Sequence, residues 1–507
     1  MTSSVVHRFP SQGALEAYAA ELALFARPGL VILLEGDLGA GKSTFARAFI
    51  HALAVEDRDF DVPSPTFTLL QAYDETRVAV AQADLHRVAA AAEIDELGLD
   101  DLLSSHVLLV EWPELLLGRA WPDVLRVALA GSGDVRTARI EARGAWNQAI
   151  TRNGAIVNFL GSTPWQGAAR RFLEGDASFR RYETLAKDHR NAILMDMPAR
   201  PDGPPVKNGK PYSAIAHLAE DIGAVVAVNA ELVARGYSAP KVESVDLGAG
   251  FAVIEDLGRN VYGRMMLAGE DMRQPMQAAA AVLADMATRD WPATVMIDSR
   301  QSHTLSRYDL EAQLIEIDLL PTWFWPHVRG AAIGGDERAQ FEAIWTELLP
   351  LTEPKRPVWT LRDYHSPNLL WMPEREGLGR VGIIDTQDCL LGHPAYDLAS
   401  LLQDARVDVA FDFADELFEH YCSLRAARGS FDRGSFEVAY ALLGAQRATK
   451  ILGIFARLSK RDGKPGYLRH MPRVSGYLER NLRHPVLAPL KAWFERHLPA
   501  AMHEAAR

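Results

Sequence analysis

The sequence contains little cysteine and no long hydrophobic run. Cys389 and Cys422 are its only cysteines, which are too few for a disulfide framework or a zinc cluster. No apolar run approaches the roughly 18 residues that a membrane-spanning helix needs. The first residues also lack the apolar core of a signal peptide. We therefore expect a cytoplasmic protein that does not enter a membrane.

Basic charge is scarce in the first part of the chain. Residues 1–150 carry 12 Lys and Arg against 21 Asp and Glu, a net charge of −9, and the remainder supplies −3 of the total of −12. Nucleic-acid affinity depends on neutralising phosphates with basic side chains, so this part is a poor candidate for gripping nucleic acid directly. If it serves RNA, we expect it to act through protein partners. The length of 507 residues predicts two or three globular domains.

A glycine-rich turn at residues 36–43 matches the phosphate-binding pattern G-x-x-x-x-G-K-[ST]. An unbroken apolar run at 30–34 predicts a buried strand before it, and apolar spacing over 45–53 predicts a helix after it. Such a turn directs backbone N–H groups at phosphate oxygens. We expect Lys42 to neutralise the β and γ phosphates and the Ser43 hydroxyl to ligate Mg²⁺. The residues expected to bind the nucleotide are Asp37, Leu38, Gly39, Ala40, Gly41, Lys42, Ser43 and Thr44.

Two further apolar strands in this part end in carboxylates. Residues 78–84 end in Asp84, and residues 107–111 end in Glu111. A strand-end carboxylate beside a P-loop is the usual second ligand of the nucleotide's Mg²⁺, a role that we assign to Glu111. Apolar residues at helical spacing over 11–26 predict a helix before the P-loop strand.

These blocks resemble TsaE, the small ATPase of bacterial tRNA threonylcarbamoylation. The resemblance covers residues 8–145 and implies that ATP hydrolysis resets a complex of the proteins TsaB and TsaD, which modifies an adenosine beside the tRNA anticodon. The tRNA is then only an indirect partner. The blocks that occur in the order and at the spacing of the family are GDLGAGKST at 36–44, SPTFTLLQAY at 64–73, ADLHR at 83–87 and VEWPE at 110–114.

The resemblance also assigns roles to single residues. It implies that Ser43 and Glu111 ligate Mg²⁺, that Asp84 and Trp112 are needed for ATP hydrolysis, and that Thr66 lies in a switch-like loop. The chain departs from the H-x-D-L-Y-R block of the family at two positions, Gln82 and His86.

Three polar residues in the last third of the chain have the spacing of kinase-like phosphotransfer. Asp363 and Asn368 lie five residues apart between apolar runs, and Asp385 ends the next predicted strand. In such enzymes the first Asp accepts the proton of the acceptor, while the Asn and the second Asp hold Mg²⁺ on the phosphates. Residues 393–401 predict a helix whose Asp397 could support the catalytic loop.

This region resembles the aminoglycoside-phosphotransferase-like sugar kinases, and most of all the cell-wall amino-sugar kinases named AmgK. The resemblance implies phosphorylation of the anomeric hydroxyl of N-acetylmuramate or N-acetylglucosamine. The blocks that carry it are GDASFRRY at 175–182, AILMDMP at 192–198, AVIEDLG at 252–258, DYHSPNLLW at 363–371 and IDTQDCLLGHPAYDLASLL at 384–402.

Carried over by position, Asp363 is the catalytic base, and Asn368 and Asp385 are Mg²⁺ ligands. Most relatives have His where Leu361 stands, and a phosphate-binding Lys where Met195 ends a strand. Arg180 or Arg181 could supply that charge or could be solvated surface residues. The residues that the resemblance places around ATP are Gly175, Ala177, Ser178, Glu255 and Leu257.

The two resemblances together imply a fold class for each part. We expect an α/β P-loop NTPase domain at residues 1–150 and an α+β, protein-kinase-like bilobal domain at residues 160–507. A predicted hairpin turn at 131–134 belongs to the last strands of the first domain. Asn153-Gly154 punctuates the chain after it, so we place the boundary between residues 145 and 165.

Two alternatives to this function stay open. The first domain could be a nucleotide sensor that regulates the second, or the second could phosphorylate choline-like alcohols or aminoglycosides. Residues 447–491 are rich in Lys and Arg, which disfavours a polycationic acceptor if they lie near the site. Solvated helix faces would give the same composition. Trp323, Trp325 and His327 could line the acceptor cleft or pack in the core.

Overall fold

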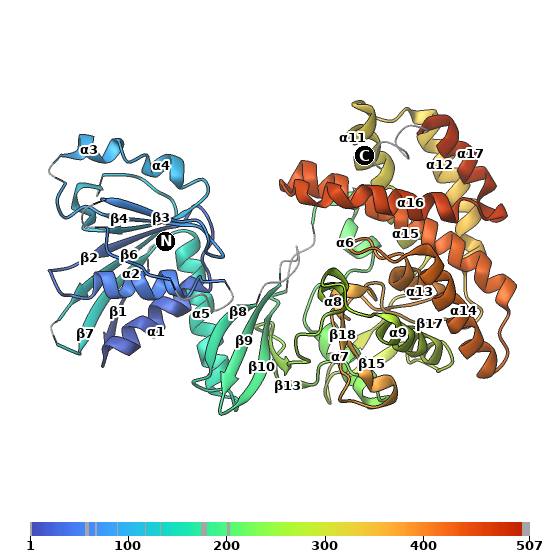
Figure 1. Ribbon diagram of the computed structural model, residues 1–507, viewed down its shortest axis with the longest axis horizontal. Coiled ribbons are helices and arrows are strands. Elements are labelled where there is room, and N and C mark those ends of the chain that lie inside the picture. Colours follow the sequence, from blue (N-terminus) through green and yellow to red (C-terminus); the bar gives the residue numbers. More distant parts are fainter. Residues whose placement is uncertain are drawn as a thin grey trace. The chain divides into compact units, whose positions relative to one another are not determined.

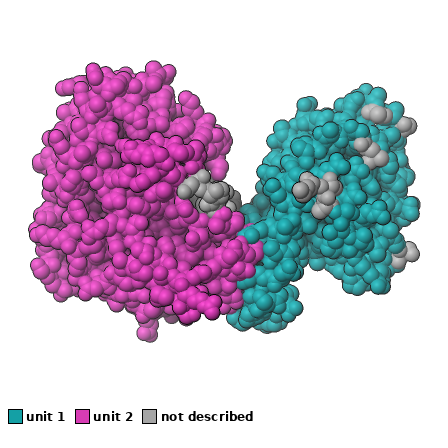
Figure 2. Space-filling view, turned by 180° about the vertical axis from the view of Figure 1, so that it is seen from behind, with its two compact units in different colours: residues 1–194 teal, residues 195–507 magenta. Residues whose placement is uncertain are grey.

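The computed structural model describes residues 3–55, 60–65, 68–88, 90–116, 118–131, 133–173, 180–199 and 203–498 (Figure 1). The chain divides into two compact units, residues 1–194 and 195–507 (Figure 2). Within the described ranges, no helix combines the length and apolarity needed to cross a bilayer.

A mixed sheet of seven strands forms the centre of the first unit. Its strands are β1 (Ser3–Phe9), β2 (Val31–Glu35), β3 (Leu70–Tyr73), β4 (Val80–Asp84), β5 (Val107–Glu111), β6 (Val124–Ala130) and β7 (Arg136–Ala142). They lie in the order β1-β7-β6-β2-β5-β4-β3. Strand β2 is parallel to β5 and β6, and β4 is parallel to β5, whereas the outer strands pair antiparallel. The P-loop strand is therefore central in the sheet.

Both faces of the central strand are covered, as its unbroken apolar run predicts. Ile32 and Leu34 pack in one core cluster with Phe45 and Phe49, and Val31 and its neighbours pack in a second cluster. Successive side chains of a strand point to opposite faces, so one short run serves two cores. The helices of this unit are α1 (Gln12–Ala23), α2 (Lys42–His51), α3 (Ala91–Asp95), α4 (Leu99–Leu102) and α5 (Ala145–Gly161), with a short helix η1 (Pro113–Leu116).

Helix α5 corrects one prediction from the sequence. Asn153-Gly154 predicted a break, but the helix continues through this pair to Gly161. Tertiary contacts outweigh the local preference of these residues for turns, because Asn153 is buried and donates a hydrogen bond to Glu21 of α1 at 2.9 Å. Arg170, in the strand that follows, donates to the Asn153 side chain at 2.7 Å.

The second sheet has five strands, β8 (Ala169–Leu173), β9 (Arg181–Lys187), β10 (Arg190–Asp196), β13 (Val242–Asp246) and β14 (Phe251–Glu255). Their order is β13-β14-β10-β9-β8. Four small antiparallel pairs accompany it, namely β11 (Pro205–Lys207) with β12 (Lys210–Pro211), β15 (Thr294–Met296) with β16 (Ser302–Thr304), β17 (Val358–Thr360) with β20 (Leu390–Gly392), and β18 (Leu369–Trp371) with β19 (Val381–Ile383).

Strands β8 and β9 of this sheet belong to the first unit, β10 crosses the division between the units, and the helices that follow in the chain all lie in the second unit. Its α-helices are α6 (Tyr212–Ile215), α7 (Gly223–Ala234), α8 (Tyr262–Leu267), α9 (Arg273–Met286), α10 (Leu310–Ile317), α11 (Trp325–Arg329), α12 (Gly335–Leu348), α13 (Ala395–Leu402), α14 (Phe411–Ala427), α15 (Arg433–Asp462), α16 (Met471–Asn481) and α17 (Ala488–His497). Its shorter helical segments are η2 (Leu320–Phe324), η3 (Leu349–Thr352), η4 (Ser366–Asn368), η5 (Gly377–Arg380), η6 (Pro465–His470) and η7 (Pro485–Leu487).

The long helix α15, orange in Figure 1, contributes to two hydrophobic cores. Phe436 and Leu443 pack in the core that holds α9, α13 and α14, whereas Leu442 and Leu452 pack in the core of the C-terminal helices. Trp325 packs on Trp493 of α17 with ring centroids 5.9 Å apart, so this indole takes the core alternative. Because α15 borders both cores, its polar residues can lie between the two cores.

Candidate functional sites

The predicted P-loop connects β2 to α2 and has the backbone that its glycines require. Gly36, Gly39 and Gly41 have φ angles of +133°, +80° and +106°. A Cβ at Gly36 would lie 2.3 Å from the backbone oxygen of Leu129, so a side chain cannot be accommodated there. Helix α2 begins at Lys42, directly after the turn. The strand, turn and helix predicted from the sequence are therefore confirmed.

The Lys42 ammonium is held inside this turn. Its Nζ donates to the carbonyl oxygens of Gly36 at 2.7 Å and Asp37 at 3.0 Å. The same nitrogen lies 3.6 Å from the centre of the Trp112 ring. Burial lowers the pKa of Lys42, while the nearby carboxylates, Glu111 first, act to raise it. An ammonium held by two carbonyls and the face of an indole is well placed to pair with phosphate oxygens.

Ser43 and Glu111 lie together on neighbouring elements. The Ser43 hydroxyl donates to Glu111 Oε2 at 2.8 Å, and Gln82 Nε2 donates to Oε1 at 3.0 Å. Burial raises the pKa of Glu111, and these two hydrogen bonds oppose the rise. A hydroxyl and a carboxylate are hard oxygen donors of the kind that Mg²⁺ takes beside a nucleotide, so the residues fit that ion. Gln82, a departure from the TsaE pattern, orients the carboxylate.

Asp84 lies beside this pair because β4 and β5 are parallel and Asp84 is opposite Glu111 in their register. One of its carboxylate oxygens accepts from the backbone N–H of His86 at 3.1 Å, and the other accepts from the Ser64 hydroxyl at 3.3 Å. These bonds fix the orientation of a buried carboxylate near Lys42. Thr66, in the same loop as Ser64, lies outside the described residues.

Arg136 also contacts the P-loop, and sequence reasoning missed it. From β7 its Nε donates to the Ala40 carbonyl at 3.0 Å, and its Nη2 lies 3.4 Å from the Gly39 carbonyl. These bonds engage two carbonyls of the P-loop. A residue of the last strand of the sheet, distant in the sequence, therefore stabilises the turn. No local pattern marks this arginine, since its partners lie 96 and 97 residues away.

The predicted magnesium ligands of the second site flank one hairpin. Asn368 precedes β18, Asp385 follows β19, and the register pairs Leu369 with Ile383. The backbone N–H of Ile384 donates to the Asn368 carbonyl at 3.0 Å. Asp385 adopts a left-handed backbone with φ +61°. The pairing of β18 with β19 thus places Asn368 and Asp385, which are 17 positions apart in the sequence, at the same end of two neighbouring strands. Their oxygens also fit Mg²⁺.

Asp363 lies next to this pair. The Asn368 side-chain amide donates to the Asp363 carbonyl at 3.1 Å, which ties the predicted base to the predicted metal ligand. Burial raises the pKa of Asp363, but His365 in its protonated form and the charges of Lys450, Arg362 and Arg447 outweigh burial and lower it. The carboxylate is therefore ionised near neutral pH, as a group that accepts a proton must be.

The prediction that Asp397 supports the catalytic loop is confirmed. Its two carboxylate oxygens accept from the backbone N–H groups of Leu361 at 2.7 Å and Arg362 at 2.8 Å. Burial raises the pKa of Asp397 to about 7, and the two backbone hydrogen bonds oppose that rise. The Leu361 side chain, which replaces the usual His, is buried in the hydrophobic core. Here the loop is braced through its backbone and not through a side chain at position 361.

His365 lies between two arginines beside the catalytic loop. Its Nε2 is 3.2 Å from a guanidinium nitrogen of Arg406, and its Nδ1 is 3.3 Å from one of Arg447. Burial first, and then the neighbouring charge of Arg406, lower the pKa of His365 to about 4. The imidazole is therefore neutral near pH 7, and the local charge next to Asp363 comes from arginine and lysine.

The residues predicted to surround ATP are only partly described. Glu255 ends β14 and pairs with Arg375 at 2.7 Å, and Leu257 packs with Leu370 and Met372. Gly175, Ala177 and Ser178 lie outside the described residues. Met195 is buried in β10.

Two family models match the chain. One, described as threonylcarbamoyl adenosine biosynthesis protein TsaE, matches residues 9–139, and the other, described as phosphotransferase enzyme family, matches residues 169–434. The chain belongs to the phosphotransferase enzyme family. It also carries an N-terminal TsaE domain.

Curated relatives divide in the same way. An N-acetylmuramate/N-acetylglucosamine kinase of Caulobacter vibrioides is 39% identical over 69% of this chain and 97% of its own length. One from Neisseria meningitidis is 32% identical over 63% of this chain and 88% of its own. The tRNA threonylcarbamoyladenosine biosynthesis protein TsaE of Rickettsia conorii is 31% identical over 31% of this chain and 89% of its own. Both resemblances seen in the sequence are thereby confirmed.

The structure places one of the two arginines that could supply the charge missing at Met195. Arg181, a candidate for the missing phosphate-binding charge, contacts Glu183 at 2.7 Å and stacks on the Phe25 ring at 3.6 Å. Arg170 also pairs with Glu183 at 2.7 Å, with side-chain exposures of 5% and 1%. Arg181 therefore takes part in a charge cluster on β8 and β9.

Arg136 generates a prediction for the first site. We expect Arg136→Gln to weaken binding of a non-hydrolysable ATP analogue about 10-fold, since it removes charge-assisted bonds that hold the P-loop. Isothermal titration of a chain that also carries Asp385→Ala, which weakens the second site, isolates the first. Arg139→Gln changes an exposed arginine of the same strand and should bind as tightly as the parent. Equal affinity in the two arginine variants would contradict the bracing role.

Proposed function

We propose that this chain is a bifunctional ATP-using enzyme. Its domain at residues 1–150 hydrolyses ATP in support of tRNA threonylcarbamoylation together with TsaB and TsaD. Its domain at residues 160–507 transfers the γ-phosphate of ATP to the anomeric hydroxyl of N-acetylmuramate or N-acetylglucosamine. The observation that carries the proposal is that Ser43 bonds to Glu111 at the P-loop, while Asn368 and Asp385 flank the same end of the paired strands β18 and β19.

In the first domain, Lys42 and the backbone N–H groups of the P-loop bind the β and γ phosphates of ATP. Ser43 and Glu111 would hold Mg²⁺, which would offset the charge of the phosphates. Asp84 lies near Lys42 and Glu111, where it can orient the attacking water. The acidic balance of this domain agrees with action through protein partners and with tRNA as an indirect partner.

In the second domain, Asp363 accepts the proton of the anomeric hydroxyl as its oxygen bonds to the γ-phosphorus. The bond between that phosphorus and the bridging oxygen breaks, and ADP leaves. Asn368 and Asp385 would hold Mg²⁺, which would offset the charge of the phosphates, and Asp397 keeps the loop in place through its two backbone hydrogen bonds. The product is a sugar 1-phosphate.

Positive charge near Asp363 favours this acceptor over the alternatives. Arg447 and Lys450, two of the basic residues over 447–491, act on the Asp363 carboxylate and are largely buried. A polycationic aminoglycoside or a quaternary ammonium would be repelled there. The carboxylate of a muramic acid would be attracted. Solvated helix faces therefore do not account for these two residues.

Acceptor profiling of the full-length chain tests the second activity. We expect ATP-dependent phosphorylation of N-acetylmuramate or N-acetylglucosamine, detected as the sugar 1-phosphate, and no transfer to choline or kanamycin. Asp363→Asn should lower the rate about 100- to 10,000-fold, the usual contribution of a general base. Transfer to choline or kanamycin but to neither sugar would overturn the sugar-kinase proposal.

The P-loop lysine separates the ATPase proposal from the sensor alternative. We expect Lys42→Ala to abolish support of tRNA threonylcarbamoylation, because its cation no longer binds the phosphates, and to leave the sugar-kinase rate unchanged. Both readouts are made on the same full-length variant, with the parent chain as the reference. A parallel loss of kinase activity would instead favour a nucleotide sensor.

A further inference from the structure

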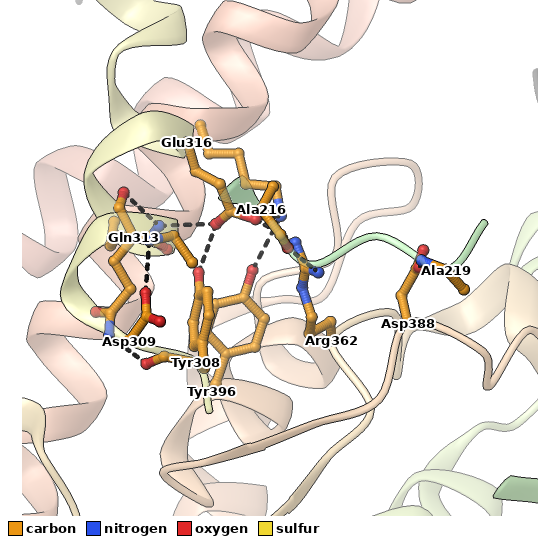
Figure 3. A network of polar contacts seen from close by, with 12 residues as sticks. Ala216, Ala219, Tyr308, Asp309, Gln313, Glu316, Arg362, Asp388 and Tyr396 are labelled. Carbon is orange, nitrogen blue, oxygen red and sulfur yellow. Dashed lines mark hydrogen bonds and ion pairs between the residues drawn. The ribbon is translucent and has the colours of Figure 1, made fainter. Parts of the chain in front are cut away.

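A single buried carboxylate gathers donors from three parts of the second unit. Glu316, near the end of α10, is fully buried. Its Oε2 accepts from the Tyr308 hydroxyl at 2.5 Å and from Gln446 Nε2 at 3.0 Å. Its Oε1 accepts from Lys450 Nζ at 2.7 Å and from a guanidinium nitrogen of Arg362. Figure 3 shows Tyr308, Glu316 and Arg362 converging in this network.

Both oxygens of this carboxylate are satisfied by two donors each, and two of the four donors are cations. Burial raises the pKa of Glu316, but Lys450 and Arg362 outweigh burial and lower it to about 2. The group is thus an ion in the interior. A buried ion that loses one partner is penalised strongly, so each partner is held firmly in position.

One of those partners is the residue directly before the predicted base. Arg362 has a left-handed backbone with φ +68°, which few residues without glycine's freedom adopt. Its side chain donates to Glu316 and, at 3.0 Å, to the Ala216 carbonyl. Its backbone N–H donates to Asp397 at 2.8 Å. The left-handed backbone of Arg362 is therefore fixed both by its own N–H group and by its side chain.

Lys450 completes the connection from α15. Its Nζ lies 2.7 Å from Glu316 and 3.5 Å from the Tyr396 hydroxyl on α13, the helix that also carries Asp397. Tyr396 stacks edge-on against Tyr308 with ring centroids 5.2 Å apart. Helices α10, α13 and α15 thus share one polar network, and the loop segment that enters it is the one at Arg362.

We propose that Glu316 and Lys450 are positioning residues for phosphoryl transfer, acting on Asp363 through Arg362. This inference rests on the proposed kinase function of the second domain. Leu361 cannot form a side-chain hydrogen bond. The side chain that anchors this loop is therefore that of the next residue, Arg362. Neither Glu316 nor Lys450 contacts the reacting atoms in this mechanism.

A positioning role has a kinetic signature that simple stabilisation lacks. Displacing a base by about 1 Å lowers the rate of the chemical step up to about 100-fold, while groups that bind substrate remain in place. A residue that only stabilises the fold would change the amount of folded enzyme and leave the kcat of the folded fraction unchanged. The split between kcat and KM therefore decides between the two roles.

The test uses the full-length chain and steady-state kinase kinetics. We expect Lys450→Met to lower kcat about 10- to 100-fold with the KM for ATP within about two-fold of the parent. Lys450→Arg keeps the cation and should restore most of kcat. Lys460→Met, on the exposed face of the same helix, is the matched control and should behave as the parent.

A milder variant covers the case in which Lys450→Met does not fold. Tyr308→Phe keeps the ring and removes one donor to Glu316, and it should lower kcat several-fold at unchanged KM. Unchanged kcat in the folded fraction of these variants would overturn the proposal, as would a loss that Lys450→Arg fails to rescue. The acceptor is whichever compound the parent phosphorylates in the profiling panel. Failure of both sugars there would overturn the proposed substrate, and the Lys450 comparison would still be decided on the compound that reacts.

Discussion

Strand pairing is the constraint on which both candidate sites depend. In the first site β2 and β5 are parallel neighbours, so the turn after one strand and the last residue of the other meet, and the Ser43 hydroxyl reaches Glu111. In the second site the antiparallel pairing of β18 with β19 sets Asn368 beside Asp385. The two arrangements differ in topology, yet both gather oxygen donors at the end of a strand. Backbone hydrogen bonds, which are insensitive to side-chain identity, therefore fix the positions of the backbone segments that carry these donors.

Buried polar groups then orient what the strands bring together. Gln82 holds Glu111 in the first unit, and Asp397 and Glu316 hold the catalytic loop in the second. A left-handed backbone at Arg362 costs roughly 1–2 kcal/mol, which the surrounding hydrogen bonds must offset. Burying each of these carboxylates costs free energy, and each accepts hydrogen bonds that offset part of that cost. Such networks give each loop one defined arrangement.

The sequence was most informative where the chemistry lies in a short stretch. Three features could be predicted because their spacing along the chain reflects one turn, one strand or one hairpin. They are the P-loop, the strand that ends in Glu111, and the trio of Asp363, Asn368 and Asp385. Strand β1 and the continuation of α5 through Asn153-Gly154 could not be predicted, since long-range partners decide both. Arg136 and Glu316 carried no local signal for the same reason. The domain boundary between residues 145 and 165, and the roles of the site residues, stay predictions.

The central claim is that one polypeptide binds magnesium-coordinated ATP in two separate places. Crystals grown with Mn²⁺ and a non-hydrolysable ATP analogue test it directly, because manganese gives an anomalous signal that marks each ion. The account predicts one peak between Ser43 and Glu111 and another between Asn368 and Asp385, each beside triphosphate density. Well-ordered crystals with saturating nucleotide that lack the peak at one or both places would contradict it.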